Sequence, residues 1–231
     1  MKQIFGLVPA AGSGVRMQAD RPKQHLLLGG RTLLQRSLDA LLADARVGAV
    51  YVVVAPGDTR VLDSDLPSRC VLLPQGGATR AASVHAGLAA LRAVAGPQAW
   101  VLVHDAARPC LSAQDLAALI DRAGAQEGGG LLATPLGDTL KRATSDRSVQ
   151  TVPREGLWRA LTPQFFALDI LWRALEACGG AAADGITDEA SAVERLGLQP
   201  LLVPGSAANI KVTTPDDLAL AQAILAQQGR W

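Results

Sequence analysis

Residues 4–17 read IFGLVPAAGSGVRM, and this stretch indicates the fold class. The apolar run at residues 4–9 predicts a short buried strand, and the glycines that follow predict a loop. The loop is not the dinucleotide-binding fingerprint, because Met17 stands where the third glycine would be. It is not a P-loop either, because no Gly-Lys-Ser/Thr triplet follows at the required offset. The stretch therefore predicts a strand that ends in a small-residue loop, whose backbone N–H groups can approach a phosphate closely.

The same order of strand and helix repeats along the chain. Further strands are predicted at residues 49–55 (AVYVVVA), 71–73, 100–104 (WVLVH), 131–133 and 200–203. Helices are predicted at residues 32–43, 80–94, 112–123, 168–177, 188–196 and 215–227. Strands that are apolar on both faces are typical of a parallel sheet covered on both sides. We expect a single α/β domain, residues 1–231, with a mostly parallel sheet and helices on both faces.

Residues 133–164 break this alternation. Two extended segments of alternating polarity, residues 134–143 and 148–158, are joined by residues 144–147 and predict a β-hairpin. A hairpin cannot bury its own apolar face and needs a partner. We therefore expect residues 133–164 to form a projecting arm that packs on a second subunit.

Composition excludes several classes of protein. The formal net charge of +1 leaves no basic footprint for nucleic acid or an anionic membrane, so phosphates must be bound by local cations. No apolar run is long enough for a membrane span, and no signal peptide is evident, so we expect a cytoplasmic protein. Three cysteines without CxxC spacing predict free thiols rather than disulfides or a zinc site.

Charged residues follow two of the predicted strands, where open α/β sheets bind their ligands. Arg16 and Lys23 follow the first strand and could meet a triphosphate, although solvated cations beside GxG are also typical of a surface turn. Asp105 follows the strand at residues 100–104 and could hold Mg²⁺ between phosphates. A turn-capping role for Asp105, paired with Arg108, explains its position equally well.

The remaining polar segments are individually weaker signals. GGATRAASV, residues 76–84, opens a helix after a strand, where glycines could admit a base ring and Ser83 could bind it. A permissive helix start explains the same glycines. Other polar segments lie in the arm and beyond it, and any one of them is consistent with a solvated face: DTLK (138–141), Arg154, TPQ (162–164), TDE (187–189) and NIKV (209–212).

Taken together, the segments resemble the 2-C-methyl-D-erythritol 4-phosphate cytidylyltransferases. The motifs PAAGSGVRM with PKQ, GGATRAASV, VHDAARPC, PLGDTLK, REGLWRALTPQ, TDEASAVE and NIKVTTPDDL occur in the family's order over nearly the whole chain. The resemblance implies a nucleotidyltransferase-type fold and a homodimer formed through the arm. It also implies transfer of a cytidylyl group from CTP to a sugar-alcohol phosphate, with release of pyrophosphate, in non-mevalonate isoprenoid synthesis. Ribitol-5-phosphate cytidylyltransferases share much of the motif set and stay open as an alternative, as does a regulatory module that binds nucleotide without turnover.

The resemblance also implies roles for single residues. The catalytic cations would be Arg16, Lys23, Arg154 and Lys211. The nucleotide would contact Ala10, Ala11, Gly12, Gly14, Gly77 and Ser83. The acceptor would contact Arg108, Thr139, Thr162 and Thr187, some of them across the dimer. Asp105 would be the acid linked to Mg²⁺ or another divalent cation. One departure is Ala78, where many relatives carry an acidic residue, and this bears on a base or ribose contact.

The expected chemistry needs cations rather than a general base. Both reactants are polyanions, so positioning and charge neutralisation dominate the transfer. The acceptor phosphate has a second pKa of about 6 and is already mostly dianionic at neutral pH. We therefore expect no catalytic role for His25, His85 or His104.

Overall fold

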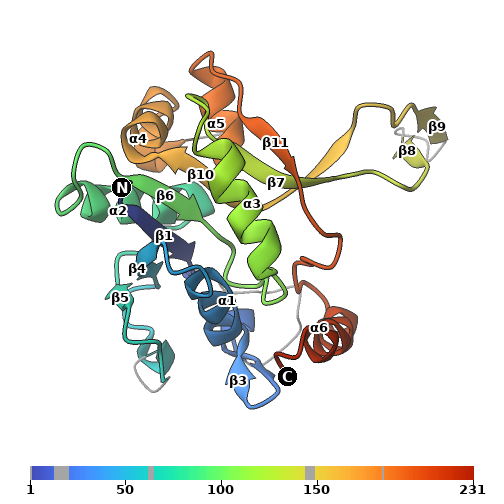
Figure 1. Ribbon diagram of the computed structural model, residues 1–231, viewed down its shortest axis with the longest axis horizontal. Coiled ribbons are helices and arrows are strands. Elements are labelled where there is room, and N and C mark those ends of the chain that lie inside the picture. The colour runs from blue at the N-terminus through green and yellow to red at the C-terminus, as the bar shows by residue number, and fades with distance from the viewer. Residues whose placement is uncertain (1, 13–20, 62–64, 144–148, 184) are drawn as a thin grey trace.

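The computed structural model describes residues 2–12, 21–61, 65–143, 149–183 and 185–231. Its centre is a seven-stranded sheet in the order β11-β7-β10-β6-β1-β4-β5 (Figure 1). The strands are β1 (Ile4–Pro9), β4 (Val47–Val53), β5 (Cys70–Leu73), β6 (Trp100–Val103), β7 (Gly130–Pro135), β10 (Trp158–Ala167) and β11 (Leu201–Pro204). Neighbouring strands run parallel, except that β10 is antiparallel to both β6 and β7. The predicted mostly parallel sheet is confirmed.

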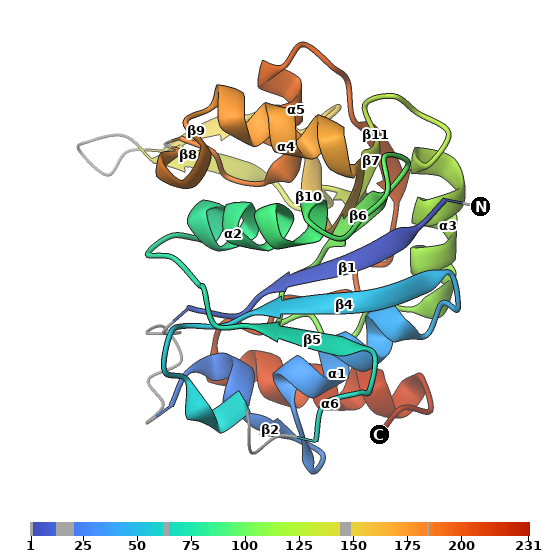
Figure 2. The same ribbon diagram turned by 90° about the vertical axis from the view of Figure 1, so that its left-hand side faces the viewer.

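Helices cover both faces of this sheet, as the alternation predicted. The helices are α1 (Leu33–Leu42), α2 (Arg80–Arg92), α3 (Ala113–Ala123), α4 (Leu168–Ala177), α5 (Glu189–Arg195) and α6 (Pro215–Gln227). One apolar core joins α1 and α3 to the face that carries Ile4 and Val8 of β1. A second core joins α2, α4 and α5 to the face that carries Phe5 and Leu7 (Figure 2). Successive β1 side chains therefore enter different cores, as the two-residue period of a strand requires.

Side-chain caps fix where several helices begin. In α1, Thr32 Oγ1 accepts the Gln35 N–H at 3.1 Å, and Gln35 Oε1 accepts the Thr32 N–H at 2.7 Å, which makes a capping box. Helix α2 starts beside Thr79, whose hydroxyl accepts the Ala82 N–H. Helix α5 is capped by Asp188, the residue before it, whose carboxylate accepts the Ser191 N–H. The starts of α2 and α5 matter below, because they carry residues of the site.

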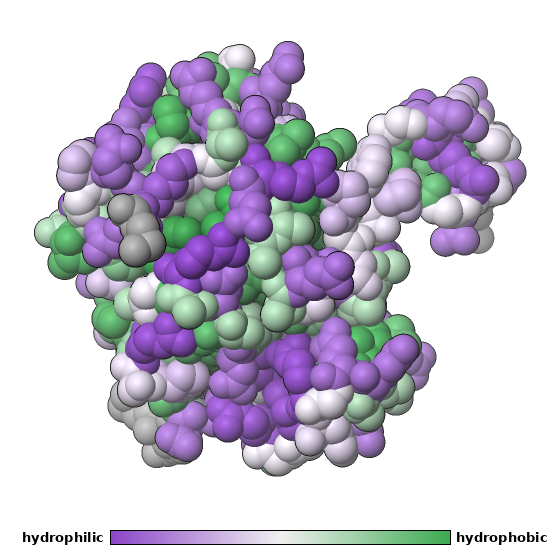
Figure 3. Space-filling model, in the orientation of Figure 1, coloured by the Kyte–Doolittle hydropathy of each residue, from purple (hydrophilic) through white to green (hydrophobic). Residues whose placement is uncertain are grey.

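The predicted arm is shorter than residues 133–164. Its projecting part is a separate two-stranded sheet of β8 (Leu140–Ala143) and β9 (Val149–Val152), mainly hydrophilic on the face shown in Figure 3. Both ends of the predicted range instead belong to the central sheet, in β7 and β10. Strand β10 was not recognised because Thr162, Pro163 and Gln164 interrupt its apolar pattern, although all three are buried. The joining residues 144–147 lie outside the described residues.

Smaller elements were not predicted. A short hairpin of β2 (Leu27–Leu28) and β3 (Arg31–Thr32) precedes α1. Within the described residues, the 3₁₀ turns η2 (Lys23–His25), η3 (Thr59–Val61) and η4 (Gly180–Ala182) lie in connections. Among the described residues, no helix combines the length and the apolar character that a membrane crossing requires.

Candidate active site

A cavity of about 570 Å³ opens at the carboxyl edge of β1 and β6. Its walls come from the loop after β1, the turn η2, the start of α2, the loop after β6 and the segment before α6. Eight predicted site residues line it: Ala10, Ala11, Gly12, Lys23, Gly77, Ser83, Asp105 and Lys211. Gly14 and Arg16, also predicted for this site, lie outside the described residues. Residues from both ends of the chain thus meet in one cavity, as expected for a ligand site in an open α/β sheet.

Asp105 is the centre of a cluster of charges in this cavity. One of its carboxylate oxygens lies 2.8 Å from Lys211 Nζ and 3.5 Å from Arg108 Nε, and the other lies 3.2 Å from Arg80 Nε. Burial by itself would raise the pKa of Asp105, but the positive charges of Arg80, Lys211 and Arg108 outweigh burial and hold that pKa well below its usual range. Asp105 is therefore ionised at neutral pH. The predicted pair of Asp105 with Arg108 is present as part of this larger cluster.

Lys23 is held at the cavity wall by its short helical turn. Lys23 Nζ donates a hydrogen bond to the Val212 carbonyl at 3.1 Å, which ties η2 to the segment after Lys211. Gln24 Nε2 donates to the Ala10 carbonyl at 2.8 Å, which ties the same turn to the loop after β1. His25 Nε2 lies 2.8 Å from a buried Asp58 oxygen. Three consecutive side chains thus fix η2 to three different segments, and the lysine faces the cavity with little freedom of its backbone.

The glycine loop before α2 fits closely against the loop after β1. A Cβ atom on Gly76 would lie 2.3 Å from the Cβ of Ala11 and 2.8 Å from the Val54 carbonyl oxygen, so only glycine fits there. Ser83 Oγ accepts the Gly77 N–H at 3.2 Å and donates to the Thr79 carbonyl at 3.1 Å. Ser83 therefore holds the loop in shape as well as lining the cavity. A base-binding role for Gly77 and Ser83 stays a prediction.

His104 and Thr162 fix the backbone at Asp105 from behind. His104 Nε2 lies 3.1 Å from the Arg108 carbonyl and must donate to it, so the other ring nitrogen, Nδ1, accepts the Thr162 hydroxyl at 3.0 Å. The Thr162 oxygen in turn accepts the Asp105 N–H at 3.0 Å. His104 is fully buried, as predicted, although the strand ends one residue before it, at Val103. Thr162, predicted to bind the acceptor, has its hydroxyl engaged in this network within the chain.

The neutral His104 ring should make folding stability depend on pH. Burial lowers the pKa of His104 from 6.5 to about 4. As the pH falls from 6.5 towards 4, the unfolded chain binds a proton that the folded chain does not. The contribution of His104 to the free energy of unfolding is therefore complete above pH 6.5. It decreases by about 3 kcal/mol as the pH falls through the folded-state pKa. Urea unfolding between pH 4 and 7 should show a shallower pH dependence in His104→Gln than in the wild type. Equal slopes would contradict the assignment.

The remaining predicted acceptor residues divide into two groups. Arg108 is buried at the Asp105 cluster, and its Nη1 donates to the Asn209 carbonyl at 2.7 Å. Thr187 is exposed in the loop before α5. Thr139 and Arg154 are exposed on the arm, where an Arg154 amino group donates to the Gly137 carbonyl, and neither lines the cavity of this chain. Within one chain, the structure does not bring Thr139 and Arg154 to Asp105.

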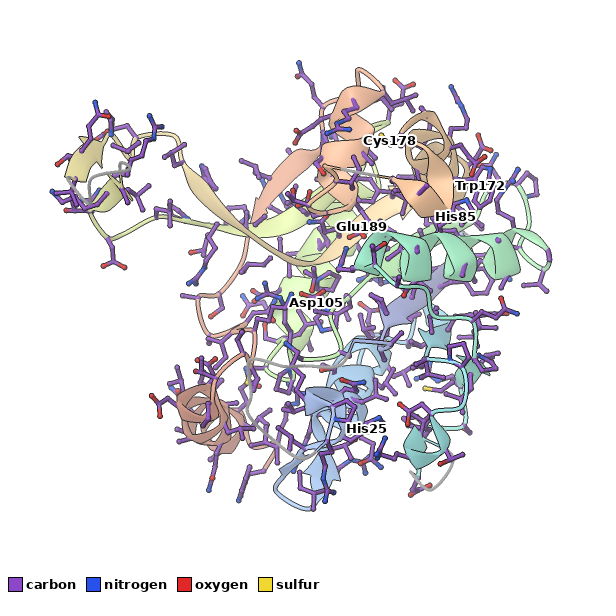
Figure 4. All side chains as sticks on the ribbon, turned by 180° about the vertical axis from the view of Figure 1, so that it is seen from behind. His25, His85, Asp105, Trp172, Cys178 and Glu189 are labelled. Carbon is purple, nitrogen blue, oxygen red and sulfur yellow. The ribbon has the colours of Figure 1, made fainter. Side chains whose placement is uncertain are left out.

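Arg80 was missed in the sequence as a residue of the site, whereas Gln164, Asp188 and Glu189 were named only in weak polar segments that a solvated face would explain. Arg80 forms a bidentate ion pair with the buried Glu189 and also contacts Asp105, which lies near Glu189 in Figure 4. Gln164 Nε2 donates to Asp188 at 2.8 Å, and its Oε1 accepts the Ala190 N–H at 2.8 Å. All of these lie inside the motifs GGATRAASV, REGLWRALTPQ and TDEASAVE, so the motifs were the only available signal. Their side-chain pairing could not be read from local pattern.

A divalent cation fits this site only as one shared with a ligand. Among the described residues, no group of three or more His, Cys, Asp or Glu side chains is placed to hold a metal ion. Asp105 provides one ionised carboxylate at the cavity wall. Mg²⁺ is usually bound by one or two carboxylates together with substrate phosphates and water. The donor set therefore fits Mg²⁺ that arrives with a nucleotide.

A mostly parallel sheet with cations and one carboxylate gathered at its carboxyl edge is typical of α/β proteins that bind phosphorylated ligands. The family model of 2-C-methyl-D-erythritol 4-phosphate cytidylyltransferase (IspD) matches residues 4–227. The chain belongs to this family.

Individual relatives agree with this assignment over almost their full length. The chain is 54% identical to the 2-C-methyl-D-erythritol 4-phosphate cytidylyltransferase of Laribacter hongkongensis, over 97% of each chain. It superimposes on the crystal structure of the Francisella tularensis enzyme with a TM-score of 0.83 and 33% identity, covering 97% of this chain and 100% of that one. For the Thermus thermophilus enzyme the TM-score is 0.79 at 34% identity, covering 98% and 100%.

Proposed function

We propose that this chain transfers the cytidylyl group of CTP to 2-C-methyl-D-erythritol 4-phosphate. The products are 4-diphosphocytidyl-2-C-methyl-D-erythritol and pyrophosphate, and the reaction is a step of non-mevalonate isoprenoid precursor synthesis. The observation that carries the proposal is the meeting of Lys23 and Lys211, far apart in sequence, in one cavity with Asp105. A cytoplasmic location is part of the same proposal.

The cations of the cavity suit the charge changes of this reaction. An acceptor phosphate oxygen attacks the α-phosphorus of CTP, and the bond from the α-phosphorus to the bridging oxygen breaks to release pyrophosphate. Two polyanions must approach each other, so Lys23 and Lys211 lower the repulsion and stabilise the charge that moves onto the leaving group. The acceptor phosphate is already ionised, and His104 is buried away from any proton transfer. No covalent intermediate with the protein is needed.

The nucleotide end of the cavity is lined by backbone and small side chains. The loops at Ala10–Gly12 and Gly76–Gly77 face each other, because Gly76 fits closely against Ala11. Such loops can offer N–H and carbonyl groups to a cytosine ring without steric hindrance. Ala78 lines the same cavity and brings no acidic group to the base or ribose. Recognition of cytosine by backbone groups is therefore the form of base contact that we propose.

Magnesium belongs to this proposal as a cofactor that binds with CTP. Asp105 is the residue that would hold it, and the ion would supply charge neutralisation at the phosphates. Lys211 lies 2.8 Å from the Asp105 carboxylate, and its side chain is partly exposed and free to reorient towards a phosphate. Arg80 and Arg108 keep Asp105 ionised when Lys211 turns away.

The arm supports a homodimer with shared sites. Thr139 and Arg154 lie on the projecting arm, outside the cavity of their own chain. Val149, Leu157 and Trp158 are exposed apolar residues of the arm region, and a second chain would bury them. We propose that the arm of each chain brings Arg154 to the acceptor phosphate in the cavity of the other. Arginine can bind a phosphate through two parallel hydrogen bonds.

Arg154→Ala is expected to raise the KM for the acceptor at least about tenfold, because a charge-assisted bidentate contact is lost. The KM for CTP should change little. Steady-state kinetics with each substrate varied in turn checks both values. An unchanged acceptor KM would count against the role of Arg154.

Mixing two variants that each impair a different part of the site tests whether Arg154 acts across the dimer. Lys23→Ala and Arg154→Ala chains are unfolded together, refolded and assayed at an acceptor concentration below the KM of the Arg154 variant. If each site combines Lys23 of one chain with Arg154 of the other, mixed dimers contain one intact site. Activity should then recover to about a quarter of the wild-type value, because random pairing of an isologous dimer yields half mixed dimers. No recovery would place both residues in one site of the same chain.

The acceptor is tested by offering CTP with 2-C-methyl-D-erythritol 4-phosphate or with ribitol 5-phosphate. Pyrophosphate release should be faster with the former by at least about two orders of magnitude in kcat/KM, since a site built to hydrogen-bond one polyol leaves polar groups unpaired with another. A preference for ribitol 5-phosphate would support the alternative acceptor. CTP binding without pyrophosphate release from either would favour a regulatory module.

A further inference from the structure

Arg80, the first residue of α2, links two carboxylates that come from different parts of the chain. Its Nη1 and Nη2 donate to the two carboxylate oxygens of Glu189 at 2.6 and 3.0 Å. Its Nε donates to Asp105 at 3.2 Å. Figure 4 shows Asp105 and Glu189 close to the start of α2. A single guanidinium group therefore spans from the loop after β6 to the start of α5.

The positive charge of Arg80 is neutralised by carboxylates of the same chain, Glu189 and Asp105. The Glu189 side chain is only 3% exposed, and its two oxygens meet the arginine in the bidentate geometry that makes strong ion pairs. Together, Glu189 and Asp105 raise the pKa of Arg80 further above its already high usual value, against the lowering effect of burial, so the guanidinium stays charged. Lys211 by contrast contacts Asp105 through its single Nζ atom, and its side chain is more exposed than that of Arg80, so it is better suited to binding phosphate.

The two carboxylates that Arg80 contacts are associated with different substrates in the proposed function. Asp105 lines the cavity together with the loops that are proposed to bind the nucleotide. Glu189 begins α5, directly after Thr187 and Asp188, and Thr187 is a proposed acceptor residue. Gln164 of β10 also holds this helix start, through Asp188 and Ala190. The start of α5 is therefore fixed to the sheet by Gln164 and to Asp105 by Arg80.

We propose that Arg80 is a positioning residue that sets Asp105 and the start of α5 relative to each other, and thereby aligns the acceptor phosphate with CTP. Arg80 lines the cavity, but its Nε, Nη1 and Nη2 atoms are all engaged by Asp105 and Glu189, so in this proposal it acts through these carboxylates and not as a ligand of the triphosphate. This inference rests on the proposed function, because it assigns Asp105 to the nucleotide and the start of α5 to the acceptor.

The test uses Arg80→Lys and Glu189→Gln in the full chain. Lysine keeps the charge but cannot contact both carboxylates with a planar fork, and glutamine keeps the shape of Glu189 but loses its charge. Each variant should lose about tenfold to 100-fold in kcat, because a small misplacement of reacting groups has effects of that size. The KM for the acceptor should rise several-fold, while the Kd for CTP, measured by calorimetry without acceptor, should stay within about threefold of the wild type.

Matched controls come from α2 and the neighbouring helix α4. Arg92→Lys lies at the other end of α2, and Glu176→Gln lies near the end of α4, both outside the cavity. Both controls should keep wild-type kinetics. Assays are run below the unfolding temperature of each variant, measured by circular dichroism. If Glu189→Gln does not fold, Glu189→Asp replaces it, because aspartate keeps the charge but is one methylene shorter.

Two results would overturn the inference. Weaker CTP binding by tenfold or more, with an unchanged acceptor KM, would make Arg80 a phosphate ligand. Kinetic constants within twofold of the wild type in both variants would make the link purely structural. Wild-type protein that releases no pyrophosphate from CTP and acceptor would contradict the proposed function instead, so the two failures are distinguishable.

Discussion

Lys23→Ala is expected to lower kcat by about 10²–10³-fold, the usual effect of removing one preorganised group that stabilises developing charge. Lys23 lines the cavity, and its turn is fixed by Gln24 and His25, so its ammonium group is held close to where phosphates would bind. The measurement is the initial rate of pyrophosphate release at saturating CTP and acceptor.

Lys2→Ala is the matched control for this variant. Lys2 lies over the Trp100 ring and outside the cavity, so its loss removes a cation of the same type without touching the site. The control should retain wild-type turnover. Equal kcat in Lys23→Ala and wild type would refute the catalytic role of Lys23.

Asp105→Asn is expected to abolish most activity and also to destabilise the protein. The carboxylate faces Arg80, Arg108 and Lys211. An amide would leave three cations close together with Glu189, the partner of Arg80, as the remaining counter-charge. Removing one partner of a buried ion pair typically costs about 3–5 kcal/mol. Lys211 is partly exposed and can turn to solvent, which places the expected loss at the lower end of that range. Urea unfolding gives the stability, and pyrophosphate release gives the activity.

Added sulfate separates the charge effect from loss of packing in this variant. If unneutralised cations cause the instability, sulfate should raise the Tm of Asp105→Asn more than that of the wild type, because an anion can replace the missing charge. Asp121→Asn is the control, since Asp121 is an exposed partner of Arg46 and its pair should contribute less than about 1 kcal/mol. An equal response to sulfate in Asp105→Asn and wild type would argue against a charge-driven loss.

The local pattern of apolar and polar residues was sufficient to predict most helices and strands of the fold. The bounds of β1, α4 and α6 agree with those expected from apolar runs, helical spacing and the proline at the start of α6. These signals act over a few residues, because side chains repeat every two residues in a strand and about every 3.6 in a helix. Where polar residues are buried by distant partners the signal fails. Strand β10 is the example, since Gln164 is buried through bonds to Asp188 and Ala190.

The sequence was sufficient to predict which segments carry the candidate site, but not which of their side chains contact one another. Asp105, Lys23 and Lys211 were named from loops and resemblance, and the structure places all three in one cavity. The function of the Thr162 hydroxyl within the chain was not predictable, because its partners His104 and Asp105 come from the distant segment after β6. Roles of Thr139 and Arg154 depend on a second chain and stay predictions.

The sequence by itself determined the alternation of strands and helices and the residues that follow each strand, because both depend on neighbours close along the chain. Only the tertiary structure decided that Arg80 meets Glu189, 109 residues away, and that three cations share Asp105. The physical reason is that local periodicity shows which face of an element is buried, but not which charged groups meet there. Those pairs follow from how the sheet and helices pack.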